Sequence, residues 1–456
     1  MVTDAPAARR RRLTLLLCSS GFFLITLDIL IVNVALTAIG RDLGGDTVAL
    51  QWTIDSYTLV FASLLLLAGN LSERLGAKRA FRSGIVLFAA ASIGCAVAPS
   101  IELLIAARAF QGAGAAVMLP ASMALIREAY VDDRERTHAL GIWAVGGAVA
   151  TAVGPVLGGA LTTGDWRLVF AINLPVSVLM LVLLRAVGRS PVATSPFDWA
   201  GQLASIVGLT ALVFGLIEGG AVGFAEPLVL ASLITAVAAI VLFLVIQARV
   251  RHPMMPLDLF RSRGMRISLG VGFAFMVSNF GTVFVLSLFL QQQLGLPPLL
   301  AGLVFLPGAA FSILGNVASG ALANRFGTRV PIVAGLLLLA LGLALAVVTA
   351  PLASPLLVGA AVCLTGLGGS VTMPPVTSVV LSSVPPARAG TASAVFNTFR
   401  QVGGAVAIAV FGAFIADRAT FVPGLQLSLT VAAVLIVGAA VASLFLRTGS
   451  ASRPIL

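Results

Sequence analysis

The sequence has very little charge. Only 10% of its 456 residues are charged, whereas a soluble domain carries about 25%. Hydrophobic residues make up 59% of the chain, and the mean hydropathy is +1.08. This composition leaves too few polar residues to cover a surface that faces water, so it excludes a soluble fold.

Cysteine and histidine are also scarce. The three cysteines, Cys18, Cys95 and Cys363, all fall in apolar runs, so we expect no disulfides. The two histidines, His138 and His252, lie near predicted loops and form no metal-ligand cluster. The phosphate-binding motif G-x-x-x-x-G-K-[S/T] is absent from the sequence, which excludes an ATP-driven pump. We therefore expect a protein without metal, without cofactor and without enzymatic activity.

Long apolar runs recur along the whole chain. Runs of about 18 or more residues can cross a hydrocarbon core of ~30 Å, and the backbone groups of a span must be satisfied within it, which favours helices. The first run follows Arg9–Arg12 and continues to Ile39 without an A-x-A-like cleavage site, so it reads as a span and not as a signal peptide. The sequence predicts an all-α polytopic membrane protein with fourteen spans, at residues 13–38, 50–70, 81–99, 101–124, 138–160, 168–187, 199–219, 225–247, 267–290, 298–320, 330–349, 354–381, 391–415 and 425–446.

The distribution of cationic residues supports this count. The chain carries 28 lysines and arginines. With both termini placed in the cytoplasm, the outer loops hold only Arg41, Arg167 and Arg418, and the spans hold only Arg108 and Arg400. All the others fall in cytoplasmic segments, as the positive-inside rule requires. The net charge of +11 thus reflects membrane topology, and we expect no nucleic-acid partner.

Two segments share one pattern. Residues 69–78 and 320–329 both read G-x-L-x-x-R-x-G-x-[K/R], and they close spans 2 and 10. They occupy the same place in two six-helix halves if spans 7 and 8 are an insertion, and duplicated halves are typical of secondary transporters. The predicted divisions are a cytoplasmic tail at 1–12, a first half at 13–190, an insertion with a basic cytoplasmic linker at 191–262, a second half at 263–446 and a cytoplasmic tail at 447–456.

Further motifs fall on the expected spans. Residues 27–36 read L-D-I-L-I-V-N-V-A-L, residues 108–114 read R-A-F-Q-G-A-G, and residues 154–159 read G-P-V-L-G-G. With the loop at 69–78, these resemble the major facilitator superfamily, specifically its fourteen-span drug:proton antiporter branch with the methylenomycin- and puromycin-type exporters. Glu73 stands where that loop motif has aspartate, and Leu30 departs from the motif of the first span.

The resemblance implies proton-coupled efflux of small organic molecules by alternating access. Its expected partners are a small-molecule substrate, protons and the lipid bilayer, and the expected form is a monomer in the cytoplasmic membrane. An alternative is a dedicated exporter of an endogenous metabolite, siderophore or lipid on the same fold. An antiporter-like subunit of a respiratory enzyme is disfavoured, because the sole lysine, Lys78, lies in a loop and no histidine lies mid-span.

Charges inside the membrane are costly and usually functional. Asp28 lies about fifteen residues into span 1, and Arg108 lies about seven residues into span 4 from the other side, so both reach a similar depth. We expect them to interact directly, or through Gln111 or water. Burial favours a protonated carboxyl, and a nearby guanidinium favours the ionised form. The pair could therefore exchange protons, or it could be a static contact that fixes helix packing.

Weaker candidates complete the site. Asp55 and Glu218 could contribute to proton coupling or to the binding of cations, or they could simply face water. Arg400, near the middle of span 13, could contact substrate or could cap the carbonyls of a neighbouring helix. The residues expected to line a substrate cavity are Asn33, Gln111, Asn397, Arg400 and Gln401.

Two groups of residues are expected to move. Small residues in span 5 permit close helix contact and a bend, and the resemblance makes Gly154, Pro155, Gly158 and Gly159 the antiporter motif. Charge pairs that break and re-form can define two states. The resemblance implies that such pairs form an inner gate, with the candidates Gly69, Glu73, Arg74, Gly76, Lys78 and Arg325.

Overall fold

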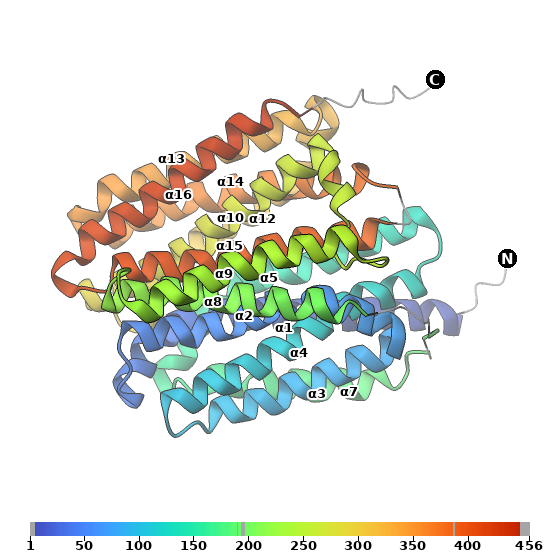
Figure 1. Ribbon diagram of the computed structural model, residues 1–456, viewed down its shortest axis with the longest axis horizontal. Coiled ribbons are helices and arrows are strands. Elements are labelled where there is room, and N and C mark those ends of the chain that lie inside the picture. The colour runs from blue at the N-terminus through green and yellow to red at the C-terminus, as the bar shows by residue number, and fades with distance from the viewer. Residues whose placement is uncertain (1–4, 189, 193–196, 386–387, 447–456) are drawn as a thin grey trace.

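The computed structural model describes residues 5–188, 190–192, 197–385 and 388–446. Within these ranges the chain is almost entirely helical and holds no strand. The long helices run side by side along one axis, and the start of α1 and the end of α16 lie at the same end of the bundle (Figure 1). The predicted C-terminal tail, 447–456, lies outside the described residues.

The first seven helices form a group that we call the N-half. They are α1 (Ala5–Leu43), α2 (Thr47–Leu75), α3 (Ala77–Ala96), α4 (Ile101–Ala129), α5 (Asp133–Gly164), α6 (Leu168–Ala171) and α7 (Asn173–Leu184).

The helices from α10 onward form a second group, the C-half. They are α10 (Arg263–Leu288) with its π-helical extension (Phe289–Gln293), α11 (Pro298–Val304), α12 (Leu306–Phe326), α13 (Arg329–Thr349), α14 (Pro355–Ser382), α15 (Ala389–Phe414) and α16 (Phe421–Ser443). Short 3-10 segments occur at Leu257–Arg261, Ala350–Leu352 and Arg418–Thr420.

Thirteen helices of the described part are long and apolar enough to span a membrane, and a shorter apolar stretch, Leu168–Leu184, occupies the place of the sixth predicted span. This stretch comprises α6 and α7, and Pro175 cannot supply the N–H that would bond to Ala171. Pro307 has the same effect between α11 and α12, which together form one span. The structure thus agrees with fourteen membrane-crossing segments.

The two halves repeat one set of helix contacts. In the N-half, α1 packs on α5 and α7, α2 packs on α4, and α3 packs on α4 and α7. In the C-half, α10 packs on α15 and α16, α12 packs on α14, and α13 packs on α14 and α16. The halves meet where α2 contacts α15 and where α5 contacts α11 and α12. This duplicated packing is what the repeated loop motif predicts.

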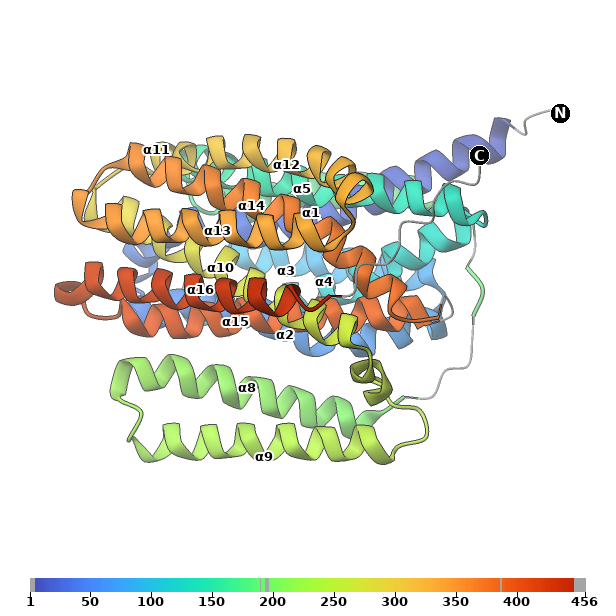
Figure 2. The same cartoon turned by 90° about the horizontal axis from the view of Figure 1, so that it is seen from above.

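The remaining two helices stand apart from the halves. Helices α8 (Trp199–Val222) and α9 (Pro227–Arg249) form a hairpin along one side of the bundle (Figure 2). Helix α8 packs on both α2 and α15, while α9 packs mainly on α8. The hairpin therefore touches both halves through one helix.

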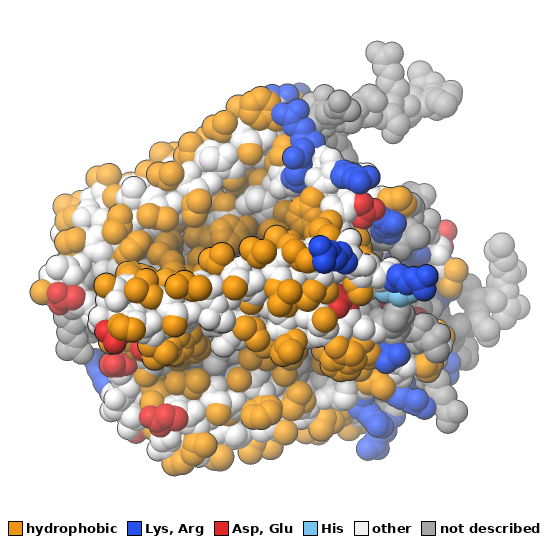
Figure 3. All heavy atoms as spheres, in the orientation of Figure 1, with side chains coloured by type: hydrophobic (Ala, Val, Ile, Leu, Met, Phe, Trp, Pro, Cys, Tyr) orange, Lys and Arg blue, Asp and Glu red, His pale blue; other side chains and the backbone are white. Residues whose placement is uncertain are grey.

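Positive charge is concentrated at one end of the bundle. Most of the blue side chains gather at one end, where red ones also occur, and the opposite end shows mainly red ones, with an orange belt between the two ends (Figure 3). We call these the basic end, which includes the α2–α3 and α12–α13 turns, and the acidic end, which includes the α1–α2 and α8–α9 turns. Each of the two repeated basic turns contains a glycine with positive φ, Gly76 at +80° and Gly327 at +75°, a conformation that side chains other than glycine rarely adopt.

Candidate functional site

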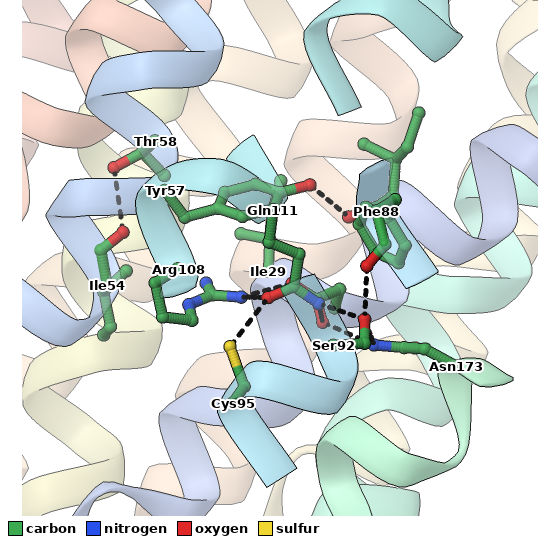
Figure 4. Close-up of polar contacts among 12 residues, drawn as sticks. Ile29, Ile54, Tyr57, Thr58, Phe88, Ser92, Cys95, Arg108, Gln111 and Asn173 are labelled. Atoms are coloured by element: carbon green, nitrogen blue, oxygen red, sulfur yellow. Dashed lines mark hydrogen bonds and ion pairs between the residues drawn. The ribbon is translucent and has the colours of Figure 1, made fainter. Parts of the chain in front are cut away.

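A polar cluster is sealed inside the N-half. Ser92 of α3, Arg108 and Gln111 of α4 and Asn173 of α7 converge there (Figure 4). Asp28 of α1 lies among them, bonded to Arg108, Gln111 and Asn173. All five are fully buried, with 0% of their surface exposed. The predicted contact between Asp28 and Arg108 is present, and it is direct.

The carboxylate of Asp28 is fully hydrogen-bonded. Arg108 Nη1 donates to Asp28 Oδ2 in a close ion pair. Gln111 Nε2 and Asn173 Nδ2 both donate to Asp28 Oδ1, at 2.7 and 2.8 Å. Ser92 Oγ accepts a second bond from each of these amides, at 2.8 and 3.3 Å. Both oxygens of the carboxylate are therefore satisfied, as a buried charge requires.

Arg108 is held from several sides. Its Nε donates to the carbonyl of Thr53 at 3.0 Å, and its Nη1 donates to Gln111 Oε1 at 2.8 Å. The guanidinium lies over the rings of Tyr57 and Phe170, at 4.4 and 5.8 Å from their centres, a favourable cation–π arrangement. Its Nη2 has no hydrogen-bond partner. Removing one member of such a buried pair leaves the other charge uncompensated, which costs about 3–5 kcal/mol.

Glycines of the 108–114 motif explain how α4 delivers these side chains. A Cβ on Gly112 would lie 2.4 Å from the Tyr57 carbonyl of α2, and a Cβ on Gly114 would lie 2.7 Å from the Phe88 amide of α3. Helix α4 therefore contacts α2 and α3 with backbone against backbone. This close approach places Arg108 and Gln111 between the two neighbouring helices.

A cleft lies between the halves, outside the polar cluster. Its volume is about 70 Å³, and its walls come from α1, α5, α10, α12 and α14, with contributions from α13. The lining is apolar apart from neutral hydrogen-bonding groups: Thr151, Ser278, Asn279, Thr282, Ser312 and Thr365. No residue that lines the cleft is charged.

Hydrogen bonds close the halves together at the acidic end. Gln51 of α2 donates to the carbonyls of Ile408 and Ala409 of α15 at 3.1 and 3.0 Å. Ser287 and Gln291 of the α10 segment donate to the backbone of α1, at the carbonyls of Asn33 and Val34, over 2.9 and 3.0 Å.

The predicted antiporter motif joins this closure. A Cβ on Gly159 would lie 2.5 Å from the Pro298 carbonyl of α11, and a Cβ on Gly302 of α11 would lie 2.2 Å from the Pro155 carbonyl. Gly154 and Gly158 meet α1 instead, where a Cβ would lie 3.0 Å from Leu30 Cβ and 2.7 Å from the Ile31 carbonyl. The motif thus forms a close contact with the opposite half on one side and with α1 on the other.

The weaker proton candidates lie in two places. Asp55 of α2 is fully buried and accepts from Thr58 Oγ1 at 3.1 Å, while its Oδ2 has no partner. Glu218 of α8 is half-buried and accepts from Trp52 Nε1 of α2 at 3.3 Å. Neither residue belongs to the Asp28 cluster, and their predicted part in coupling stays a prediction.

The five residues expected in a substrate cavity are not brought together. Asn33 donates within α1 to the Ile29 carbonyl, and Gln111 belongs to the Asp28 cluster. Asn397 accepts from Arg400 Nη1 at 3.2 Å on α15, where Gln401 is buried. None of these five is among the residues that line the cleft.

The predicted gate residues lie at the basic end of the bundle. Lys78 donates from its backbone to Ser190 Oγ at 3.0 Å and from its ammonium to carbonyls just after α7. The guanidinium of Arg74 lies 4.4 Å from the centre of the Phe197 ring. Arg325 lies 5.2 Å from the ring centre of its neighbour Phe326. Glu73 is exposed.

Four residues that contribute to the site were not predicted from the sequence: Ser92, Tyr57, Thr53 and Asn173. Ser92 and Asn173 are isolated polar residues in apolar spans, and that is the signal that could have found them. Thr53 contributes only a backbone carbonyl, which the sequence does not reveal.

Two duplicated helix halves around an uncharged cleft, with one half sealing an ion pair, define a polytopic membrane protein of the secondary-transporter class. Residues 18–408 match the family model of the Major Facilitator Superfamily. The chain belongs to this superfamily.

Curated relatives cover most of the chain. It is 36% identical over 418 residues to the "Methylenomycin A resistance protein" of Streptomyces coelicolor, covering 90% of this chain and 87% of the relative. It is 36% identical to the "Multidrug resistance protein Stp" of Mycobacterium tuberculosis, covering 92% and 79%. It is 34% identical to the "Puromycin resistance protein pur8" of Streptomyces alboniger, covering 90% and 84%.

Solved structures share the fold. A POT family transporter in complex with a thioalcohol-conjugated peptide superposes with a TM-score of 0.69 at 15% identity, covering 93% of this chain and 95% of that one. At this identity the likeness concerns the fold alone.

Proposed function

We propose that the protein exports small organic molecules, drugs or antibiotics among them, in exchange for protons by alternating access. The observation that carries the proposal is the sealed Asp28–Arg108 pair, an ion pair buried in the membrane belt of a transporter. The relatives named as antibiotic and multidrug resistance proteins support the direction and the class of substrate.

The geometry supports a coupling mechanism. In the present state the guanidinium of Arg108 is paired with the Asp28 carboxylate, and this opposite charge favours the ionised carboxylate. If rocking of the halves draws Arg108 away, Asp28 becomes a buried carboxylate without a cation, and protonation is then the least costly outcome. Substrate and proton would thus occupy different states of one carrier.

The lining of the cleft suits an amphipathic substrate of low charge. Its volume of about 70 Å³ is below the roughly 300–1,000 Å³ of a pocket for a drug-sized ligand, so binding a whole substrate requires a more open state. Its apolar walls carry hydroxyl groups from Thr151, Ser278 and Ser312 and the amide of Asn279. Such a lining binds apolar surface and offers a few hydrogen bonds for orientation.

We place the basic end in the cytoplasm, because lysine and arginine accumulate on that side of a membrane. Both termini then face the cytoplasm, the acidic end faces outward, and the present structure is closed on the outside. The protein would work as a monomer in the cytoplasmic membrane, with the α8–α9 hairpin as a lateral addition.

A growth-inhibition panel in an efflux-deficient host tests the function. Cells that express the native chain should tolerate higher concentrations of at least one compound, and Asp28→Asn should remove this resistance. In everted vesicles that hold an acid-inside proton gradient, adding that compound should release protons through the native protein and not through Asp28→Asn.

Glu102→Gln is the matched control, because Glu102 is an exposed carboxylate at the start of α4. It should behave like the native chain at the same level of membrane protein. Native resistance in cells that express Asp28→Asn would refute the role of Asp28.

A further inference from the structure

An open groove runs between α10 and α16, on the exposed surface of the C-half and toward the basic end. Its volume is about 500 Å³. Most of its lining is apolar, including Ile267 and Phe273 of α10 and Leu435 and Ala439 of α16. Figure 3 shows this face of the molecule hollowed below α16, with orange side chains on the floor.

Glycines keep the groove open. Gly270 of α10 and Gly438 of α16 both line it, and a Cβ added at either position would meet no atom within 4 Å. The corresponding helix pair of the N-half, α1 and α7, is filled: a Cβ on Gly21 would meet Phe81 at 2.9 Å and Met180 at 3.4 Å. The vacancy is therefore a property of the C-half and not of the shared fold.

Two arginines stand at the basic end of the groove. Arg263 and Arg266 lie in the first turn of α10, line the groove and are exposed. The Arg263 guanidinium lies 5.1 Å from the centre of the Phe445 ring, which borders the same opening. The nearby carboxylate of Asp258 is already paired with Arg388. The start of α10 adds the partial positive charge of a helix N-terminus.

The groove has the length of one lipid chain. Its lining extends from Leu435 of α16 to Phe445, two residues beyond the end of that helix, which is about 15 Å at ~1.5 Å per residue. That distance is half of a ~30 Å hydrocarbon core. The apolar part therefore stays within one leaflet, with the arginines at the headgroup level.

We propose that this groove binds one anionic diacyl phospholipid, such as phosphatidylglycerol. The headgroup phosphate lies between Arg263 and Arg266, and an acyl chain follows the open floor past Gly270 and Gly438. Charge complementarity selects the anionic headgroup, since basic pockets between membrane helices bind anionic lipids. This inference requires only that the bundle is embedded in a membrane, so it does not depend on the proposed export activity.

Native mass spectrometry of the purified protein tests the site. The native chain in mild detergent should retain phosphatidylglycerol in preference to phosphatidylcholine with the same acyl chains. Arg263→Gln and Arg266→Gln should each lower binding of phosphatidylglycerol about fivefold, the worth of one cation near an anionic headgroup. Arg263→Lys with Arg266→Lys should keep most of the preference, because the charge remains.

Two further sets of variants distinguish the contribution of the apolar floor from that of the headgroup charge. Gly438→Leu should lower the binding of both lipids by filling the floor, whereas Val437→Leu, an exposed neighbour that does not line the groove, should change nothing. Arg261→Gln is the charge control, because Arg261 is exposed and lies outside the lining. Glycerol phosphate at millimolar concentration should not displace the lipid, since it has no acyl chain.

Three outcomes would overturn the proposal. They are equal retention of the two lipids by the native chain, native retention of phosphatidylglycerol by both Arg263→Gln and Arg266→Gln, and an equal loss in Arg261→Gln. The thermal unfolding midpoint of each variant is measured beside its binding. For an arginine variant with an altered midpoint, the ratio of retained phosphatidylglycerol to retained phosphatidylcholine is the readout, because a folding defect lowers the binding of both lipids alike.

Discussion

The two halves share one frame and differ in their chemistry. The N-half seals a carboxylate, an arginine and two amides in its core. The C-half has no carboxylate in any of its helices, since Asp417 is the only one between residues 263 and 446. The cation within its spans, Arg400, is half-buried and is bonded to the neutral Asn397. Duplication thus preserved the packing of the helices and not their polar residues.

The cleft shows the complementary difference. Most of its lining comes from α10, α12 and α14 of the C-half, whereas the N-half contributes Leu30, Thr151 and Pro155. The half with the ion pair therefore contributes little to the cleft wall. The half with the wall holds no buried ion pair among its described residues, since its Arg388 pairs with Asp258 at an exposed position. In the proposed mechanism the N-half handles the proton and the C-half handles most of the substrate, with the relative motion of the halves as the link.

The largest expected effect contrasts the fully buried Arg108 with the half-buried Arg400, the two arginines that lie inside spans. Arg108→Gln leaves Asp28 buried without its cation, so it should lower the free energy of unfolding by about 3–5 kcal/mol and abolish export. Arg400→Gln strands no carboxylate and removes one hydrogen bond, so the loss should be about 1 kcal/mol. Thermal unfolding in one detergent compares the two variants.

The double variant sharpens this contrast. Asp28→Asn with Arg108→Gln removes both charges and should recover much of the stability lost in Arg108→Gln, without recovering export. If the losses of unfolding free energy in Asp28→Asn and Arg108→Gln add up to the loss in the double variant, the two side chains have no coupling energy. That outcome would contradict the proposed difference between the two halves.

The second prediction concerns the close contact between the halves. Gly159→Val would press a side chain into the backbone of α11, because a Cβ added at Gly159 would lie only 2.5 Å from the Pro298 carbonyl. We expect at least a tenfold loss of export with normal membrane insertion, since the outer closure could no longer form. Gly141→Val is the control on the same helix, because a Cβ there meets nothing within 4 Å. Equal export by the two variants would contradict the prediction.

Much of the fold was predictable because the membrane imposes it. Span length, the placement of arginine and the repeated loop motif are set by lipid thickness and topology, and they are visible in a sequence. The contact between Asp28 and Arg108 was predictable for the same reason, because the depth of each residue in the membrane follows from the rise of a helix. The sixth span was the hardest to define, because Pro175 interrupts it.

Other parts of the site were hidden, because they depend on which way a side chain turns. Gln111 was expected both at the cavity and as a possible bridge between Asp28 and Arg108, and it turns into the N-half toward Asp28 and Ser92. The sequence places it one helical turn from Arg108 and does not show which neighbour it faces. The residues that line the cleft could not be predicted from the sequence for another reason. Hydroxyl groups such as Ser278 and Ser312 can bond within their own helix anywhere in a span, so they carry no distinctive signal.

A moderate effect should follow from opening the outer closure. Gln51→Leu removes the two hydrogen bonds from α2 to α15 and should weaken the closed state by about 1–3 kcal/mol. Amide hydrogen exchange around Ile408 and Ala409 should accelerate by about tenfold or more. Gln426→Leu is the control, because Gln426 bonds to the Val347 carbonyl within the C-half. If Gln426→Leu accelerated exchange at the same amides as strongly, the effect would not come from the contact between the halves.

The smallest effect tests whether the α8–α9 hairpin is docked on the N-half by a specific bond. Trp52→Phe keeps the aromatic packing and removes the hydrogen bond to Glu218, at a cost of about 0.5–1.5 kcal/mol. The unfolding midpoint should fall by about 1–2 °C while export stays near native, because Trp52 belongs neither to the ion pair nor to the cleft lining. Trp199→Phe, at an exposed position on α8, should leave the midpoint unchanged. A loss of export in Trp52→Phe as large as in Arg108→Gln would instead place the hairpin inside the coupling mechanism and end the simple division of work between the two halves.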